Sequence, residues 1–241
     1  MIETLSIPAI AAHNTIKSPS NIANTTSGKT GLKEPDKLTI GSDQSTLSAL
    51  SRQLSESAVR AQSRDQTLSF KDLGTLAKNI IDKIAGSGFY ANRELHDAEV
   101  PDTDDPALLE RARQATLFER GSGKNPFAGL PPDQLRLIMY DESGSFTINE
   151  RSAAFDEEYS QDQIWKRAIN QRYVDEYNET GKSTQTLFML LEHYNALPPI
   201  EKAQYPANYV DNLISGDSSA LDMLNSLKNE PSDDQPPSAK T

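Results

Sequence analysis

The sequence predicts an all-α fold, and three observations carry this prediction. Apolar residues recur three or four positions apart in several segments, which is the spacing of one face of a helix. Residues that start or stop helices bound these segments, among them Ser69, Pro106 and Gly181. No stretch of adequate length alternates apolar and polar residues as a half-buried strand does, and no internal repeat is visible.

The 241 residues divide by composition into five segments. These are a disordered leader at 1–43, a helical hairpin at 44–86, a linker with one helix at 87–125, a compact C-terminal helical domain at 126–215, and a short helix with a disordered tail at 216–241. The leader and the tail are rich in Ser, Pro and other polar residues. They therefore bury too little apolar surface to offset the entropy lost on ordering.

The hairpin consists of two amphipathic helices. The first, at 45–63, carries an apolar stripe made of Leu47, Leu50, Leu54, Ala58 and Ala61. The second is capped by Ser69 and ends near Ala85. A two-helix hairpin has little core of its own, so we expect its apolar face to need the C-terminal half or another protein. In the linker, Pro106 starts a helix that ends near Arg120.

The C-terminal domain centres on two helices joined by a polar loop. The segment 130–133 starts the first helix with two prolines and an acidic residue, and the loop 141–146 ends it. Thr147 and Glu150 then have the spacing of a capping box, in which each side chain bonds the backbone N–H of the other. The second helix ends near Gly181. Its aromatic stripe contains Phe155, Tyr159, Trp165, Ile169, Tyr173 and Tyr177.

The aromatic residues of this domain have two interpretations. Five tyrosines either line a groove for a partner helix or pack a core with their hydroxyls at the surface, and the base rate favours the core. They are Tyr173, Tyr177, Tyr194, Tyr205 and Tyr209. Trp165, the single tryptophan, is predicted to be buried against a helix that Ser183 caps and that extends to Asn195.

The helix–loop–helix at 130–177 resembles an EF-hand, the calcium-binding module. Over twelve residues, this resemblance implies metal ligands at loop positions 1, 3, 5, 7 and 9. They are Asp141, Ser143, Ser145, Thr147 through its carbonyl, and Asn149.

The loop departs from the EF-hand pattern at two positions. Phe146 stands where the family has a turn glycine, and Ser152 replaces the bidentate glutamate. Only Asp141 supplies a charged oxygen, so we expect calcium affinity no tighter than about millimolar. The simpler interpretation is a capped turn, in which Thr147→Ala costs roughly 1 kcal/mol of stability and Asp141→Ala costs less.

Charge and composition disfavour several functions. The net charge of −11 disfavours nucleic acids and anionic membrane surfaces, which are bound chiefly through Lys and Arg. The absence of cysteine removes disulfides, thiolate metal sites and cysteine nucleophiles. No apolar run approaches the ~18 residues of a membrane span. The three histidines have no metal-spaced partners, and no catalytic constellation is visible, so we do not expect an enzyme.

The leader has no acidic residue between Glu3 and Glu34, although the chain is acidic. This composition resembles the uncleaved leaders of bacterial type III secretion substrates, and the C-terminal region is similar to uncharacterised helical proteins of Gram-negative bacteria. The resemblance implies a protein of the bacterial cytoplasm that is exported without cleavage. We therefore predict a non-enzymatic protein-interaction protein, effector-like and with a protein partner. The alternative is a weak calcium-responsive module. The oligomeric state is not predicted.

Overall fold

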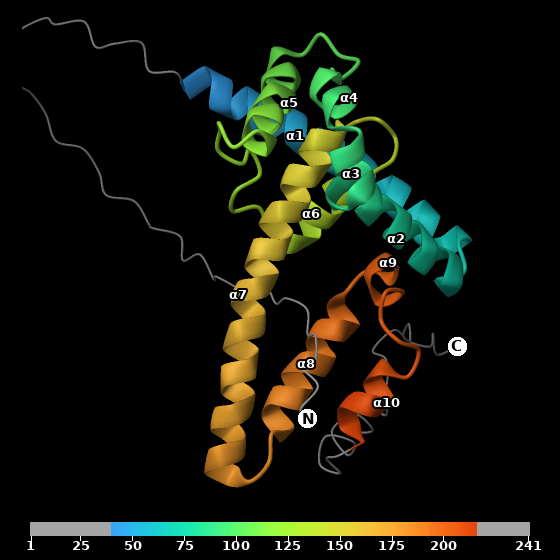
Figure 1. Ribbon diagram of the computed structural model, residues 1–241, viewed down its shortest axis with the longest axis vertical. Coiled ribbons are helices and arrows are strands. Elements are labelled where there is room, and N and C mark those ends of the chain that lie inside the picture. Colours follow the sequence, from blue (N-terminus) through green and yellow to red (C-terminus); the bar gives the residue numbers. More distant parts are fainter. Residues whose placement is uncertain (1–39, 216–241) are drawn as a thin grey trace, which may run out of the picture. The chain divides into compact units, whose positions relative to one another are not determined.

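The computed structural model describes residues 40–215 of the chain, with side chains from residue 49 onward (Figure 1). All regular secondary structure in this range is helical, which confirms the all-α prediction. The predicted leader up to residue 39 and the segment 216–241 lie outside the described residues. Among the described helices, none combines the length and the apolar character that crossing a bilayer requires.

The described chain divides into two compact units. Unit 1 comprises Arg64–Ile81 and the residues from 158 to 215, and unit 2 comprises 40–63 and Asp82–Glu157. Three helices continue from one unit into the other: α1 (Ile40–Thr67), α2 (Phe70–Ala85) and α7 (Ile148–Thr180).

Unit 2 contains four further helices: α3 (Ser87–Ala91), α4 (Arg93–Ala98), α5 (Pro106–Glu119) and α6 (Pro132–Met139). The prediction of a single helix in 87–125 is therefore wrong. The helices α3 and α4 are too short for a hydrophobic period to reveal them, and contacts distant in sequence hold them. Phe89 is buried, and the Asn149 side chain of α7 donates to the carbonyl of His96 over 3.2 Å.

Two of the predicted helix starts, those of α2 and α7, are confirmed by their hydrogen bonds. Ser69 Oγ accepts from the backbone N–H of Asp72 over 3.2 Å at the start of α2. Thr147 and Glu150 form the capping box, because Thr147 Oγ1 accepts from the Glu150 N–H at 3.2 Å and Glu150 Oε2 accepts from the Thr147 N–H at 2.8 Å. These bonds satisfy backbone donors that have no partner within their own helix.

The core of unit 2 is built around a buried ion pair. Arg111 of α5 donates from Nε to Glu150 Oε1 over 2.6 Å, and the two side chains are 4% and 0% exposed. The rings of Phe127 and Phe146 lie 5.6 and 5.1 Å from the guanidinium carbon of Arg111. Arg111 also donates to Gln53 of α1 over 2.7 Å. The same glutamate therefore caps α7 and neutralises the arginine of α5.

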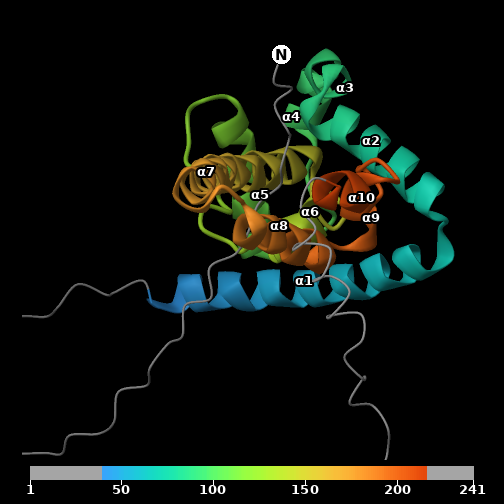
Figure 2. The ribbon, with the colours of Figure 1, turned by 90° about the horizontal axis from the view of Figure 1, so that it is seen from below.

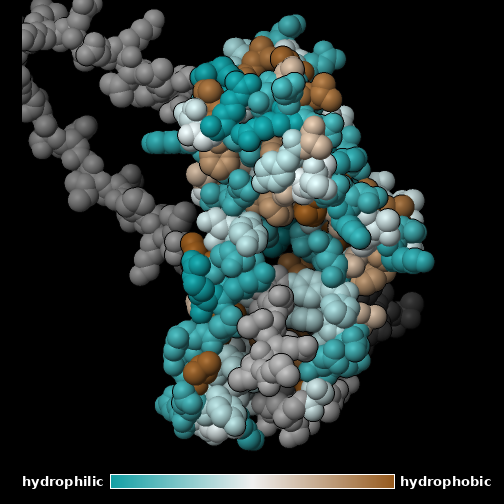
Figure 3. All heavy atoms as spheres, in the orientation of Figure 1, coloured by the Kyte–Doolittle hydropathy of each residue, from teal (hydrophilic) through white to brown (hydrophobic). Residues whose placement is uncertain are grey.

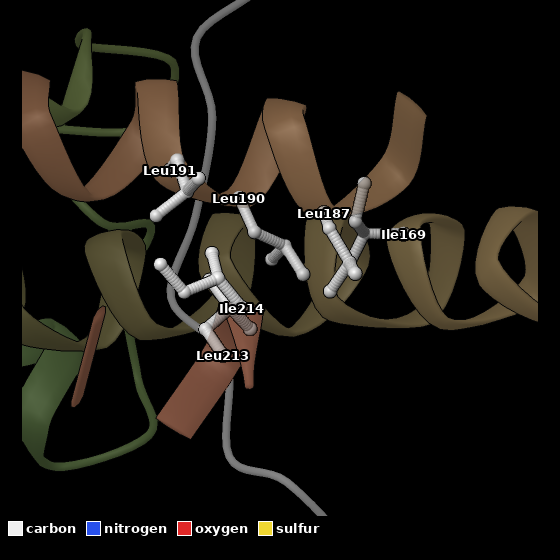
Figure 4. Packing of buried hydrophobic residues seen from close by; sticks show 6 residues of the cluster. All are labelled: Ile169, Leu187, Leu190, Leu191, Leu213 and Ile214. Atoms are coloured by element: carbon white, nitrogen blue, oxygen red, sulfur yellow. The ribbon is translucent and has the colours of Figure 1, made fainter. Parts of the chain in front are cut away.

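Unit 1 is organised by α8 (Thr184–Ala196), which runs antiparallel to α7 and lies between α7 and α10 (Tyr209–Ile214) (Figures 1 and 2). Leucines of α8 face Ile169 of α7 and the last residues of α10 (Figure 4). The buried cluster consists of Ile169, Leu187, Leu190, Leu191, Leu213 and Ile214. The short helix α9 (Pro199–Lys202) connects α8 to α10.

The close approach of α2 to the end of α9 requires a glycine. A Cβ atom on Gly74 would lie 2.6 Å from the carbonyl oxygen of Ala203, well inside van der Waals contact. Gly181 has a φ of 74° after the end of α7, the left-handed conformation predicted for that position.

The start of α8 differs from the prediction that Ser183 caps it. The Ser183 hydroxyl instead donates to the carbonyl of Tyr173 over 3.1 Å. The carboxylate of Glu176, from α7, accepts from the backbone N–H groups of Gln185 and Thr186 at 2.8 and 2.9 Å. Partial burial acts to raise the pKa of Glu176, but these bonds and the one from the Thr186 hydroxyl outweigh it and lower the pKa.

The aromatic stripe of α7 is only partly buried. Trp165 packs against α8 as predicted, with its ring 4.8 Å from that of His193, but it is half-buried rather than enclosed. Tyr159, Tyr173 and Tyr177 are exposed. The prediction that Tyr173 and Tyr177 pack in a core is therefore wrong. A spacing of four residues advances roughly 40° beyond a full helical turn at each step, so the stripe rotates away from a straight partner helix.

We predict that Arg111→Ala lowers the free energy of unfolding by about 3–5 kcal/mol, because Glu150 would remain buried without a partner. Arg113→Ala on the same helix is the control, since its bond to Glu110 is exposed and exposed pairs contribute less than about 1 kcal/mol. Chemical denaturation of both variants measures the difference. Equal losses in the two variants would show that the buried pair does not hold unit 2 together.

Candidate functional site

The loop that resembles an EF-hand separates its five predicted ligands into two groups. Asp141, Ser143 and Ser145 lie together: Asp141 Oδ1 accepts from the Ser143 N–H at 2.8 Å, and the two serine hydroxyl oxygens are 2.8 Å apart. The Thr147 carbonyl accepts from the N–H of Arg151 in the first turn of α7. The Asn149 side chain is fully buried and donates toward α4 and α5.

The carboxylate of Asp141 is occupied by protein groups. Arg60 Nη2 of α1 donates to Oδ2 over 2.5 Å, and the hydroxyl of Ser57 donates to the same oxygen. Burial acts to raise the pKa of Asp141, but the bonds from Arg60, Ser57 and Ser143 outweigh it and lower the pKa to about 2. A cation would have to displace the guanidinium to reach this oxygen.

The two departures from the EF-hand pattern have structural reasons. Phe146 is buried in the core of unit 2 beneath the guanidinium of Arg111, a position that glycine could not fill. Ser152 is buried and bonds to Glu119 of α5 instead of facing the loop. No group of three or more His, Cys, Asp or Glu side chains suited to a metal occurs between residues 49 and 215. The metal site stays a prediction, and no contact favours it.

Sequence reasoning missed the partners of Asp141. Ser57 and Arg60 lie three residues apart on the predicted helix at 45–63, and Ser57, seven residues after Leu50, is buried beside the leucine stripe. No local pattern pairs them with a residue more than 80 positions later, since the match depends on how α1 packs. Asp141 thus holds α1 as well as its own loop, a contact that the expected stability costs of Asp141→Ala and Thr147→Ala did not include.

Glu119 and His96 are ionisable groups of unit 2 that have buried side-chain atoms without a hydrogen bond. Burial raises the pKa of Glu119 to about 7, and its Oε1 has no partner. Burial lowers the pKa of His96, although Glu99 and Asp97 act in the opposite direction, and neither ring nitrogen is bonded. Neither residue lines the groove of about 530 Å³ that unit 2 forms between α1, residues 101–108 and residues 143–145. We find no acid–base pair aimed at a substrate there.

Unit 1 has a second groove, of about 800 Å³, between α7 and α8. Its apolar residues include Trp165, Ile169 and Met189, which also pack against the buried cluster. Its polar residues include Asp175 and Glu179 of α7, and both are exposed. We call this feature the α7/α8 groove. It combines an apolar floor with a charged rim, as ligand and peptide sites commonly do.

The part of α7 in unit 1 exposes several large apolar side chains. From residue 158 to 180, only Asp162 and Ile169 are buried. Tyr159, Tyr173, Val174 and Tyr177 are 52%, 40%, 50% and 57% exposed. They lie within roughly 100° of the helix circumference, and we call them the tyrosine face. The space-filling view shows one face of the molecule, on which hydrophilic residues dominate and hydrophobic residues form separate small patches (Figure 3).

The three other tyrosines between residues 158 and 215 of unit 1 pack on one another. Tyr194, Tyr205 and Tyr209 have ring centroids 4.6 to 5.3 Å apart, and each is partly buried. This cluster joins α8 to the turn before α10 and to α10 itself. The core interpretation therefore describes these three residues well, whereas Tyr173 and Tyr177 belong to the surface.

Comparisons with protein-family models, with curated proteins and with solved structures find no match to this chain.

We predict that Asp141 contributes stability at neutral pH that is lost in acid. Its folded pKa of about 2 lies below the ordinary value of 3.8, so the contribution is complete above pH 3.8 and disappears as the pH falls toward 2. The shift corresponds to roughly 2 kcal/mol. Asp141→Asn should remove this part of the acid dependence, measured by denaturation between pH 2 and pH 6, whereas Asp133→Asn, at the first turn of α6, should retain it. An unchanged slope in Asp141→Asn would contradict the assignment.

We also predict that calcium does not bind the loop more tightly than about millimolar, because Arg60 already neutralises Asp141, the one carboxylate among the five predicted ligands. Calorimetric titration of the full chain measures this. A micromolar isotherm that Asp141→Ala abolishes would overturn the prediction and establish a calcium-responsive module.

Proposed function

We propose that this protein is a non-enzymatic interaction protein that binds another protein through the part of α7 in unit 1. The observation that carries the proposal is the tyrosine face: Tyr159, Tyr173, Val174 and Tyr177, which are exposed on one side of a helix. Single exposed apolar residues are ordinary, but Tyr173, Val174 and Tyr177 lie together near the end of α7, with Tyr159 further along the same side, and they offer a candidate surface.

The way α7 is held explains why this surface is available. Beyond residue 157 the helix touches the rest of unit 1 along a narrow line, marked by Asp162, Ile169 and Glu176 at intervals of seven. Most other residues of α7 between 158 and 180 are exposed among the described residues. A folded helix presents such side chains without the entropic cost of ordering them at the moment of binding.

The residue types also fit a protein interface. Tyrosine offers a large apolar area with few rotatable bonds and a hydroxyl that can bond at the rim, and it is enriched among residues that dominate binding energy. Catalysis receives no comparable support, since Glu119 and His96 lie outside the groove of their unit. Calcium sensing receives none either, because Arg60 holds Asp141.

The test is capture of a binding partner from the native cell with the full chain and two variants. We expect the double variant Tyr173→Ala/Tyr177→Ala to lose the captured protein, because it removes two large side chains from the tyrosine face. Tyr90→Ala is the matched control, since Tyr90 is a 67% exposed tyrosine of unit 2. Thermal unfolding confirms that each variant is folded.

Recovery of the same protein by all three chains would show that α7 is not the binding surface. Loss of the protein in Tyr90→Ala alone would move the surface to unit 2. Recovery of no protein above background from the unaltered chain would contradict an interaction function.

A further inference from the structure

The α7/α8 groove lies on the opposite side of the helix pair from α10. Residues of α8 advance roughly 100° per position, so Met189 and Gln185 lie on one side of α8 while Leu187 and Leu191 lie on the other. Leu187 and Leu191 belong to the cluster that packs α10, and Met189 and Gln185 line the groove. Helix α10 therefore occupies one flank of the α7/α8 pair, and the groove occupies the other.

The floor of the groove suits an apolar helix face. Trp165 provides a large partly buried ring, Met189 a flexible side chain that adapts to different shapes, and Ile169 a fully packed base. On the opposite flank, Leu213 and Ile214 of α10 show how the same helix pair accepts aliphatic residues of a third helix. The groove extends along α7 from Trp165 to Thr180, roughly 22 Å at 1.5 Å per residue, which matches a helix of about four turns.

The rim of the groove is acidic. Asp175, Glu176 and Glu179 line it together with the single basic residue Arg172. The Glu176 carboxylate is engaged by the start of α8, whereas the Glu179 side chain extends from an exposed position near the end of α7. Asp175 accepts one bond from Gln171 over 2.8 Å and keeps further lone pairs for a partner. The chain's net charge of −11 adds a long-range attraction for basic segments.

We infer that the α7/α8 groove binds a basic amphipathic helix of a partner protein, with the apolar face of that helix over Trp165, Ile169 and Met189 and its Lys or Arg side chains beside Asp175 and Glu179. This inference rests on the proposed function and specifies the chemistry of the partner. It follows the general mode in which an amphipathic helix places apolar anchors in a groove and uses flanking charges for selectivity.

The test uses the full chain and three synthetic peptides of four helical turns. The first has Leu at helical spacing and Lys on its flanks, the second has the same Leu positions with Glu on its flanks, and the third has the first composition scrambled. Trp165 is the only tryptophan, so its fluorescence reports occupancy of the groove directly. We expect the basic peptide alone to shift the emission to shorter wavelength, with an affinity that falls as salt is added.

Matched variants test the role of the rim. Asp175→Asn/Glu179→Gln removes two negative charges from the groove and should weaken binding of the basic peptide by about fivefold or more. Asp102→Asn/Asp104→Asn removes two negative charges from an exposed loop of unit 2 and should leave the affinity within about twofold, because net charge alone acts weakly in salt. Circular dichroism checks that both variants keep their helices.

Four outcomes would overturn the inference. Equal binding of basic and acidic peptides would show apolar adhesion without charge selection, and no binding of any peptide would show that the groove is not a helix site. Concentration-dependent self-association that Met189→Glu abolishes would make a second copy of the chain the occupant. A shift of Trp165 emission in the free protein on Leu224→Asp substitution would make the chain's own C-terminal segment the occupant.

The experiment separates this inference from the proposed function. If binding of the native partner is lost in Tyr173→Ala/Tyr177→Ala but unchanged in Asp175→Asn/Glu179→Gln, the interaction function holds and the basic-helix groove is refuted. If Asp175→Asn/Glu179→Gln loses peptide binding and Tyr173→Ala/Tyr177→Ala loses the native partner, both the groove inference and the interaction function are supported.

Discussion

The buried pair of Arg111 and Glu150 is the interaction on which unit 2 depends. Glu150 uses one oxygen to cap the start of α7 and the other to hold Arg111 of α5, while Arg111 reaches Gln53 of α1. Two phenylalanine rings shield the guanidinium from water. A charge pair in such a place contributes little net stability compared with apolar packing, but it strongly penalises arrangements that leave one partner alone. It therefore specifies how α1, α5 and α7 meet.

Features encoded within a few residues were predictable from the sequence. The capping box, the Ser69 cap and the glycine after α7 depend on local backbone chemistry, and the structure contains all three. The longer helices of the described range also follow from their apolar spacing, whereas α3 and α4, which are only five and six residues long, do not. Short polar helices have no period to detect, and their contacts come from residues about 50 positions away.

Features that depend on packing between distant segments were not predictable. Glu176 caps α8 in place of Ser183 because α7 and α8 fold back on each other, and Arg60 meets Asp141 because of the way α1 lies. The fate of the aromatic stripe has a similar cause. Its spacing of four suggested a core, but a straight helix pair can bury only part of a stripe that rotates. The exposed remainder is the tyrosine face, which became the basis of the functional proposal.

The central functional claim is that unit 1 presents α7 to a partner protein. Hydroxyl-radical footprinting of the chain, free and in its native complex, tests this most directly, because oxidation reports the solvent exposure of individual tyrosines. The account predicts that oxidation of Tyr173 and Tyr177 falls in the complex while that of Tyr90, which is 67% exposed in unit 2, stays the same. Protection of Tyr90 with unchanged oxidation of Tyr173 and Tyr177 would contradict it.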